Sequence, residues 1–189
     1  MSNEKNTLAA KRYAEALIDI GKEEKLSYVS ISVDLANIQS ILSKSKDLYE
    51  TLTNPLISIE DKEYLIEKAF EKDVDILIRN FLKILAEKNR FDLIYDIIKI
   101  YGSLLDEING IARVEVISAV ELNDMEQGDI QAKLASKLKK QIVIKYKIDR
   151  SIIAGLVIKM GDDIIDMSIA RKLENYKMAL TKYKRKNIW

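Results

Sequence analysis

The side chains available for chemistry are carboxylates, amines, guanidiniums, phenols and hydroxyls, because the 189 residues include no His and no Cys. This composition excludes Ser–His and Cys–His nucleophiles, zinc fingers, iron–sulfur ligation and disulfide frameworks. Asp162, Asp163 and Asp166 form an acidic cluster, which could supply oxygen ligands to a hard cation. Roughly four more oxygens would be needed and the spacing matches no EF-hand loop, so we interpret the group as a solvated turn.

No carboxylates are arranged for acid–base catalysis. Glu23, Glu24 and Glu107 lie in no sequence context that predicts a pocket. Nothing resembles a glycine-rich phosphate-binding loop either. We therefore expect a protein that is not an enzyme and has no catalytic residue, no cofactor and no metal site.

The charges nearly cancel over the whole chain but are unevenly distributed. Residues 1–105 carry 15 basic and 18 acidic side chains, a net charge of −3, whereas residues 106–189 carry 16 and 12, a net charge of +4. The tail Tyr183–Trp189 combines cations with aromatic residues, a composition that suits RNA or lipid headgroups. Because few cations give limited phosphate neutralisation, we interpret the tail as a solvated chain end.

The first hundred residues have the pattern of consecutive helices with short connections. Apolar residues recur three and four positions apart, Pro55 interrupts the pattern, and Ser58 with Asp61 resembles a capping box. The predicted helices are Leu8–Lys22, Tyr28–Ser43, Asp47–Thr53, Ile59–Phe70, Asp75–Lys88 and Asp92–Asn109.

After Asn109-Gly110 the apolar period changes to two, which is typical of strands. The predicted strands are Ala112–Ser118, Gln141–Ile148, Gly155–Met160 and Asp163–Met167, and the predicted helices are Asp124–Lys139 and Ser168–Tyr183. We therefore expect a multidomain α and α+β protein. A six-helix bundle over residues 1–108 precedes a small α+β domain over residues 109–189, which has a short mixed sheet and a basic C-terminal tail.

Two of the predicted helices, Leu8–Lys22 and Asp75–Lys88, are apolar around more of their circumference than a surface helix needs. Projected at 100° per residue, each has an apolar arc of about 200°, roughly twice the usual stripe. Either both helices lie deep in the bundle, or one edge of each binds an amphipathic helix of another protein. In the second interpretation the small Ala9 and Ala16 beside Tyr13 allow a foreign helix to approach closely.

Three segments point to a known family. Leu8–Leu17 (LAAKRYAEAL), Asn80–Phe91 (NFLKILAEKNRF) and Lys147–Ser168 together resemble the delta subunit of the rotary proton-translocating ATP synthase, whose mitochondrial counterpart is the oligomycin-sensitivity-conferring protein. The resemblance extends over nearly the whole chain in the right order, and the third segment is its most specific part. The chain departs from the family's pattern at Ala154 and at Met167, where a positive φ would strain the methionine.

The resemblance implies a stator connector, peripheral on the cytoplasmic face of the bacterial membrane, that couples rotation to proton flow and ATP synthesis. Its N-terminal domain would bind the N-terminal helix of an alpha subunit between the first and fifth helices, and its C-terminal domain would bind the b subunits of the peripheral stalk. The implied groove residues are Ala9, Tyr13, Ala16, Ile20, Leu77, Phe81 and Ile84, and the implied stalk-side motif is Gly155, Gly161 and Asp166.

Two further expectations concern nucleic acid and membranes. An RNA-binding antitermination-type helical protein is the alternative function, but it predicts a basic bundle, and residues 1–105 are net acidic. No apolar run approaches the ~20 residues of a membrane span, and the N-terminus lacks a secretory signal. We therefore expect no nucleic-acid partner and only an indirect association with the membrane.

Overall fold

The computed structural model describes residues 2–24, 27–161 and 163–186, with side chains described between residues 5 and 178 of these ranges. The chain divides into two compact units, unit 1 over Met1–Leu105 and unit 2 over Asp106–Trp189. The described residues form a mostly helical fold with one small mixed sheet of four strands. The predicted domain boundary after residue 108 corresponds to the end of helix α6 (Ile94–Ile108), which continues past the division between the units.

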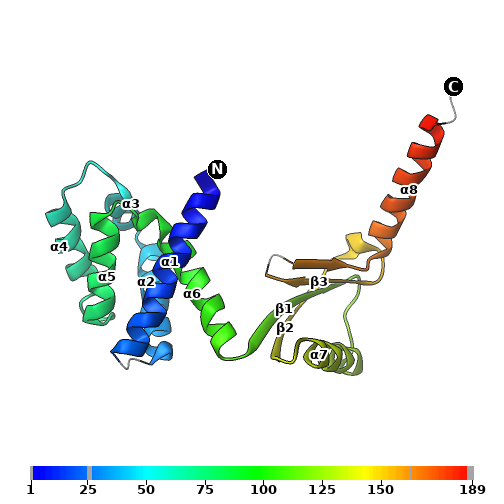
Figure 1. Ribbon diagram of the computed structural model, residues 1–189, viewed down its shortest axis with the longest axis horizontal. Coiled ribbons are helices and arrows are strands. Elements are labelled where there is room, and N and C mark those ends of the chain that lie inside the picture. Colours follow the sequence, from blue (N-terminus) through cyan, green and yellow to red (C-terminus); the bar gives the residue numbers. More distant parts are fainter. Residues whose placement is uncertain (1, 25–26, 162, 187–189) are drawn as a thin grey trace. The chain divides into compact units, whose positions relative to one another are not determined.

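Unit 1 consists of helices joined by short turns (Figure 1). They are α1 (Ser2–Glu23), α2 (Tyr28–Lys44), α3 (Lys46–Thr53), α4 (Ile59–Phe70), α5 (Ile76–Glu87), the 3₁₀ turn η1 (Phe91–Leu93) and α6. Side-chain caps explain several of the starts. The Ser58 hydroxyl accepts a hydrogen bond from the Asp61 N–H at 3.1 Å, and the Asp75 carboxylate accepts one from the Leu77 N–H at 2.8 Å.

Two helix starts in unit 1 differ from the prediction by more than one residue. The first helix begins at Ser2 and not at Leu8, because no Gly or Pro between them interrupts the helix. The last helix was expected from Asp92, but residues 91–93 form a 3₁₀ turn before α6 begins at Ile94. Short 3₁₀ turns are common where one helix succeeds another closely.

Unit 2 has a four-stranded sheet in the order β2-β1-β3-β4. The strands are β1 (Ile111–Ser118), β2 (Gln141–Ile148), β3 (Leu156–Met160) and β4 (Asp163–Asp166). β1 pairs in parallel with β2, whereas β3 is antiparallel to both β1 and β4. The parallel pair requires a crossover connection, and α7 (Asp124–Leu138) provides it.

One face of the sheet is covered by α7, as Figure 1 shows. Leu134 of α7 packs into a core with Val114, Val116, Ile142 and Ile158, which the strand register places on the same face. A capping box fixes the start of α7, because the Asn123 side chain and the Glu126 N–H form a hydrogen bond of 2.9 Å and the Glu126 carboxylate accepts from the Asn123 N–H.

The last helix, α8 (Ile169–Lys186), follows β4 after a two-residue connection. The predicted Ser168 cap is present, since the Ser168 hydroxyl accepts a hydrogen bond from the Arg171 N–H at 3.1 Å. The side chains of the basic tail Tyr183–Trp189, and Asp162 in the predicted acidic turn, lie outside the described residues. Among the described helices, none is both long and apolar enough to cross a bilayer.

Candidate partner-binding site

The residues of α1 that the sequence predicted for partner binding lie along one edge of the helix. Ala9, Tyr13 and Ile20 are half-buried against the core of unit 1, and Ala16 is exposed. The adjacent edge of α1, which includes Ala14, is fully buried. The wide apolar arc of α1 is therefore only partly used by the core of unit 1.

Helix α5 divides its apolar arc in the same way. Ile78, Leu82 and Leu85 are buried in the core of unit 1, whereas Leu77 is half-buried and Ile84 is 47% exposed. We refer to the predicted residues of the two helices together as the α1–α5 strip. The strip consists of Ala9, Tyr13, Ala16, Ile20, Leu77, Phe81 and Ile84.

Phe81 has a different place from the other residues of the strip, because only 5% of its side chain is exposed. The rings of Tyr13 and Phe81 meet edge to face, with centroids 6.1 Å apart and an interplanar angle of 74°. This contact joins α1 to α5. Phe81 therefore packs against the ring of Tyr13 and exposes little surface to a partner. Helical periodicity does not reveal this difference between the two residues.

The end of α5 is fixed by the motif that carried part of the resemblance. Asn89 adopts a positive φ of 50°, the Arg90 N–H donates to the Leu85 carbonyl at 2.8 Å, and the Asn89 N–H donates to the Ala86 carbonyl at 3.0 Å. These two bonds form a Schellman motif. The buried Lys62 of α4 also reaches the Asn89 side chain, with its Nζ 3.5 Å from Oδ1. The motif thus ends α5 at a defined position beside α1.

Ion pairs attach α5 to α4 on another side of the helix. The Glu67 carboxylate lies 2.7 Å from the Lys83 amine and 3.3 Å from Arg79 Nε, and Arg79 also donates to the Glu71 carbonyl at 2.8 Å. The hydrogen bond from Lys83 lowers the pKa of Glu67, and the Arg79 charge adds to this effect. These contacts hold α5 in place without using the strip.

A charged pair lies next to Tyr13 in the same region. The Lys88 amine donates to the Glu87 carboxylate at 2.8 Å. This hydrogen bond and the Glu87 charge raise the pKa of Lys88, with a smaller contribution from Tyr13. The pair is solvent-exposed, so it contributes little to stability.

The strip is partly exposed, through Ala16 and Ile84. Cavities of about 430 Å³ and about 380 Å³ occur elsewhere, the first in unit 2 and the second beside Asp34 and Asp75 in unit 1, and no residue of the strip lines either one. In the smaller cavity, burial raises the pKa of Asp34, although a hydrogen bond from the Asp75 N–H at 3.2 Å opposes this. Among the described residues no group of three carboxylates could hold a metal ion.

In unit 2 the predicted stalk-side motif, Gly155, Gly161 and Asp166, lies in the segment that leads into α8. Gly155 has φ +89°, and a Cβ built on it would lie 2.5 Å from the Met167 carbonyl oxygen. The flanking residues bond across this contact, with the Ile169 N–H donating to the Ala154 carbonyl and the Met167 N–H to the Leu156 carbonyl, both at 2.9 Å. Gly155 is therefore required by the close approach of two segments of the chain.

The other two residues of the motif have local roles. Gly161 has φ +56° in the turn after β3, where a Cβ would meet nothing within 4 Å. Asp166 accepts a hydrogen bond from the Ser168 N–H at 2.9 Å. Hydrogen bonds from the Ser168 side chain and backbone lower the pKa of Asp166. Both residues shape the hairpin and the entry to α8.

Backbone strain occurs in unit 2 at a residue that the sequence did not indicate. Within the described residues the non-glycine positions with positive φ are Asn89, Lys139 and Ile153, so Met167 is not strained as its departure from the family's pattern suggested. Ile153 has φ 69° and ψ −58°, and the Ala154 N–H donates to the Ile152 carbonyl at 2.9 Å. This is a classic γ-turn, which is rare and unfavourable for a β-branched residue.

Comparison with known proteins supports the same relationship over nearly the whole chain. The model of the ATP synthase delta (OSCP) subunit family matches residues 9–180. A curated "ATP synthase subunit delta" of Desulfosudis oleivorans is 36% identical over 96% of this chain and 99% of that protein. The protein of the same name from Clostridioides difficile is 34% identical over 91% of this chain and 95% of its own length.

A solved structure has the same fold. A chain from the mitochondrial ATP synthase hexamer of Toxoplasma gondii superposes with a TM-score of 0.64 at 19% identity, covering 91% of this chain and 97% of that one. At this identity the likeness concerns the fold alone. The family match and the curated relatives carry the assignment: the chain belongs to the ATP synthase delta (OSCP) subunit family.

Proposed function

We propose that this chain is a stator connector of a rotary ATP synthase, and that it joins the catalytic head to the peripheral stalk without performing any chemistry. The membership of the family and the names of the curated relatives support this role. A stator connector needs two separate attachments, and the chain has two compact units. The bundle of helices in unit 1 serves as the head-binding domain, and unit 2 serves as the stalk-binding domain.

The α1–α5 strip is the observation that carries the head-side attachment. The strip exposes Ala16 and Ile84 and includes the half-buried Tyr13, whose ring contacts that of the buried Phe81 edge to face. An amphipathic helix can cover such a strip with its apolar face, and a supported tyrosine is typical of an energetically dominant contact. The N-terminal helix of an alpha subunit would bind here.

Unit 2 would bind the b subunits of the peripheral stalk. Gly155, Gly161 and Asp166 contribute to this attachment indirectly, because they fix the hairpin and the start of α8. The protein would then associate with the membrane only through the complex, on its cytoplasmic face.

The head-side attachment is tested by substituting Ala16, which is exposed and therefore tolerates a charge without loss of stability. In Ala16→Asp we expect the affinity for a peptide of the alpha-subunit N-terminus to fall about 30-fold, which is roughly 2 kcal/mol, because the carboxylate would be desolvated in the contact. Isothermal titration calorimetry measures the affinity, and circular dichroism measures the melting temperature.

The matched control is Ala36→Asp, which places the same charge on an exposed alanine of α2 outside the strip. We expect it to bind the peptide with the affinity of the unmodified chain. Equal binding by Ala16→Asp and the unmodified chain would refute the proposed attachment. An RNA competitor in the same titration tests the alternative function, which no comparison supports, and displacement of the peptide by RNA would favour that alternative.

A further inference from the structure

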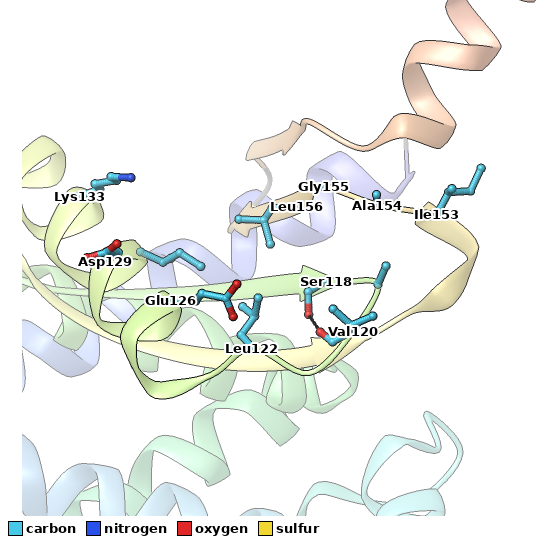
Figure 2. Close-up of a pocket in the computed structure, with 12 residues that line it drawn as sticks. Ser118, Val120, Leu122, Glu126, Asp129, Lys133, Ile153, Ala154, Gly155 and Leu156 are labelled. Carbon is cyan, nitrogen blue, oxygen red and sulfur yellow. Dashed lines mark hydrogen bonds between the residues drawn. The ribbon is translucent and has the colours of Figure 1, made fainter.

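A cavity of about 430 Å³ opens in unit 2 at a place that the proposed function does not use. Figure 2 shows that three segments surround it: the end of β1 and the residues after it, the first half of α7, and the start of β3. Most of the side chains that line it are aliphatic. They are Ala119, Val120, Leu122, Ile130, Ile153, Ala154 and Leu156.

Two of these aliphatic side chains are turned to solvent. Val120 is 68% exposed and Ile153 is 57% exposed, although both line a largely apolar cavity. Figure 2 shows that they come from different segments, Val120 from the residues after β1 and Ile153 from the loop before β3. The folding of the chain does not itself bury these side chains, so an apolar partner would gain contact area from both.

The backbone conformation of Ile153 also favours a binding site at this cavity. Its γ-turn is unfavourable for a β-branched side chain, and glycine would adopt the same backbone without the steric cost. Since more than half of the side chain is exposed, packing within the chain does not account for an isoleucine there. Strained residues of this kind cluster at binding sites, where the rest of the fold holds them in place.

The charges around the cavity indicate which charge a partner should carry. Glu126 and Asp129 line the α7 side of the cavity with one cation, Lys133. Asp129 and Lys133 are one helical turn apart, yet within the described residues they form no ion pair. Exposed Glu121 and Asp124 add two further carboxylates nearby in the sequence. This excess of negative charge is complementary to a basic side chain.

We propose that this cavity is the docking site in unit 2 for a partner helix that packs aliphatic side chains against Val120 and Ile153 and places a lysine or arginine opposite Asp129. The inference rests on the proposed stalk attachment and specifies it, because it assigns the contact to a cavity and to a chemistry. The occupant is a helix of the peripheral stalk with an aliphatic residue next to a basic one.

The test uses the full-length chain and the soluble part of the b subunit from the same organism, with the affinity measured by biolayer interferometry. Val120→Asp should weaken binding about tenfold, because it places a carboxylate in the apolar contact beside existing acids. The matched control is Met125→Asp, since Met125 is 79% exposed on α7 and does not line the cavity. The control should bind like the unmodified chain.

Ile153→Gly separates binding from stability. We expect the melting temperature to stay equal or to rise, because the strain is relieved, while the affinity falls about fivefold through loss of the side chain. Asp129→Lys should also weaken binding, and more strongly at low salt than at high salt.

The outcomes distinguish this inference from the function on which it rests. Binding of the stalk fragment that is unaffected by Val120→Asp and Ile153→Gly would overturn the docking site and leave the proposed function supported. Absence of binding by the unmodified chain would overturn both. Self-association of the chain that is abolished by Val120→Asp, with stalk binding intact, would show that a second copy occupies the cavity and would also overturn the inference.

Discussion

Gly155 is the glycine of unit 2 whose replacement should cost the most. Its φ of +89° disfavours any side chain, and an added Cβ would lie 2.5 Å from the Met167 carbonyl oxygen. We expect Gly155→Ala to destabilise unit 2 by about 3 kcal/mol, through strain together with displacement of the start of α8. Hydrogen exchange of the β1 amides measures the stability of unit 2 separately from that of unit 1.

Gly161 provides the control for this substitution. It also has a positive φ, of 56°, but a Cβ at this position meets nothing within 4 Å. Gly161→Ala should therefore cost only the local strain, about 1 kcal/mol. If both variants lowered the protection of β1 equally, the close approach at Gly155 would not be the cause of its cost.

Single residues also mark the limit of what the sequence could predict. The spacing of apolar residues placed Tyr13 and Phe81 on one edge of their helices, but which of two adjacent rings lies beneath the other depends on how α1 and α5 pack. The positive φ of Ile153 could not be predicted, because a β-branched residue normally has a negative φ. The residue type therefore indicated the opposite of the observed conformation. Its turn is set by the connection between η2 (Arg150–Ile152) and β3.

At the scale of elements, two helices carry glycines that nothing in the packing requires. Gly102 in α6 and Gly128 in α7 are exposed, and a Cβ at either meets nothing within 4 Å. Replacement of each by alanine should raise the free energy of unfolding by about 0.5–1 kcal/mol, because alanine loses less backbone entropy in a helix. Urea unfolding followed by circular dichroism measures the change.

Gly21 of α1 is the contrasting case. A Cβ there would lie 3.0 Å from the ring of Tyr28, where α1 and α2 approach each other closely. The ring would have to move, and its neighbour Tyr101 is buried, with a hydroxyl that donates to the Tyr28 carbonyl at 3.2 Å. Gly21→Ala should leave the free energy of unfolding unchanged or lower it. A gain equal to that at Gly128 would show that the interface between α1 and α2 adapts freely.

The types and order of the elements were predictable because their signals are local. Caps at Ser58, Asn123 and Ser168 marked three helix starts, and the change of apolar period after Gly110 marked the first strand. Signals were lacking where no residue forces an end, as before Leu8. The cavity in unit 2 was missed for a different reason: its lining comes from three segments that only the fold brings together.

At the scale of the molecule, the two units offer surfaces of different chemistry. The α1–α5 strip is aliphatic and aromatic. The charges of Glu87 and Lys88 next to it pair with each other. The cavity of unit 2 is lined mostly by aliphatic side chains, with the carboxylates of Glu126 and Asp129 on its α7 side. A stator connector held at both ends must withstand repeated torque, and nanomolar attachment corresponds to about 12 kcal/mol. Apolar burial can supply this free energy, whereas exposed ion pairs at roughly 0–1 kcal/mol each cannot.

This difference predicts that salt affects the two attachments unequally. Raising NaCl from about 0.05 M to about 0.5 M shortens the Debye length from roughly 14 Å to roughly 4 Å and screens exposed charges. The Kd for the alpha-subunit peptide should change less than about twofold, because its contact is apolar. The Kd for the stalk fragment should rise about fivefold, because part of that affinity comes from the carboxylates near Asp129. Paired titrations of one preparation at the two salt concentrations measure both, and a steep salt dependence of peptide binding would contradict an apolar head-side attachment.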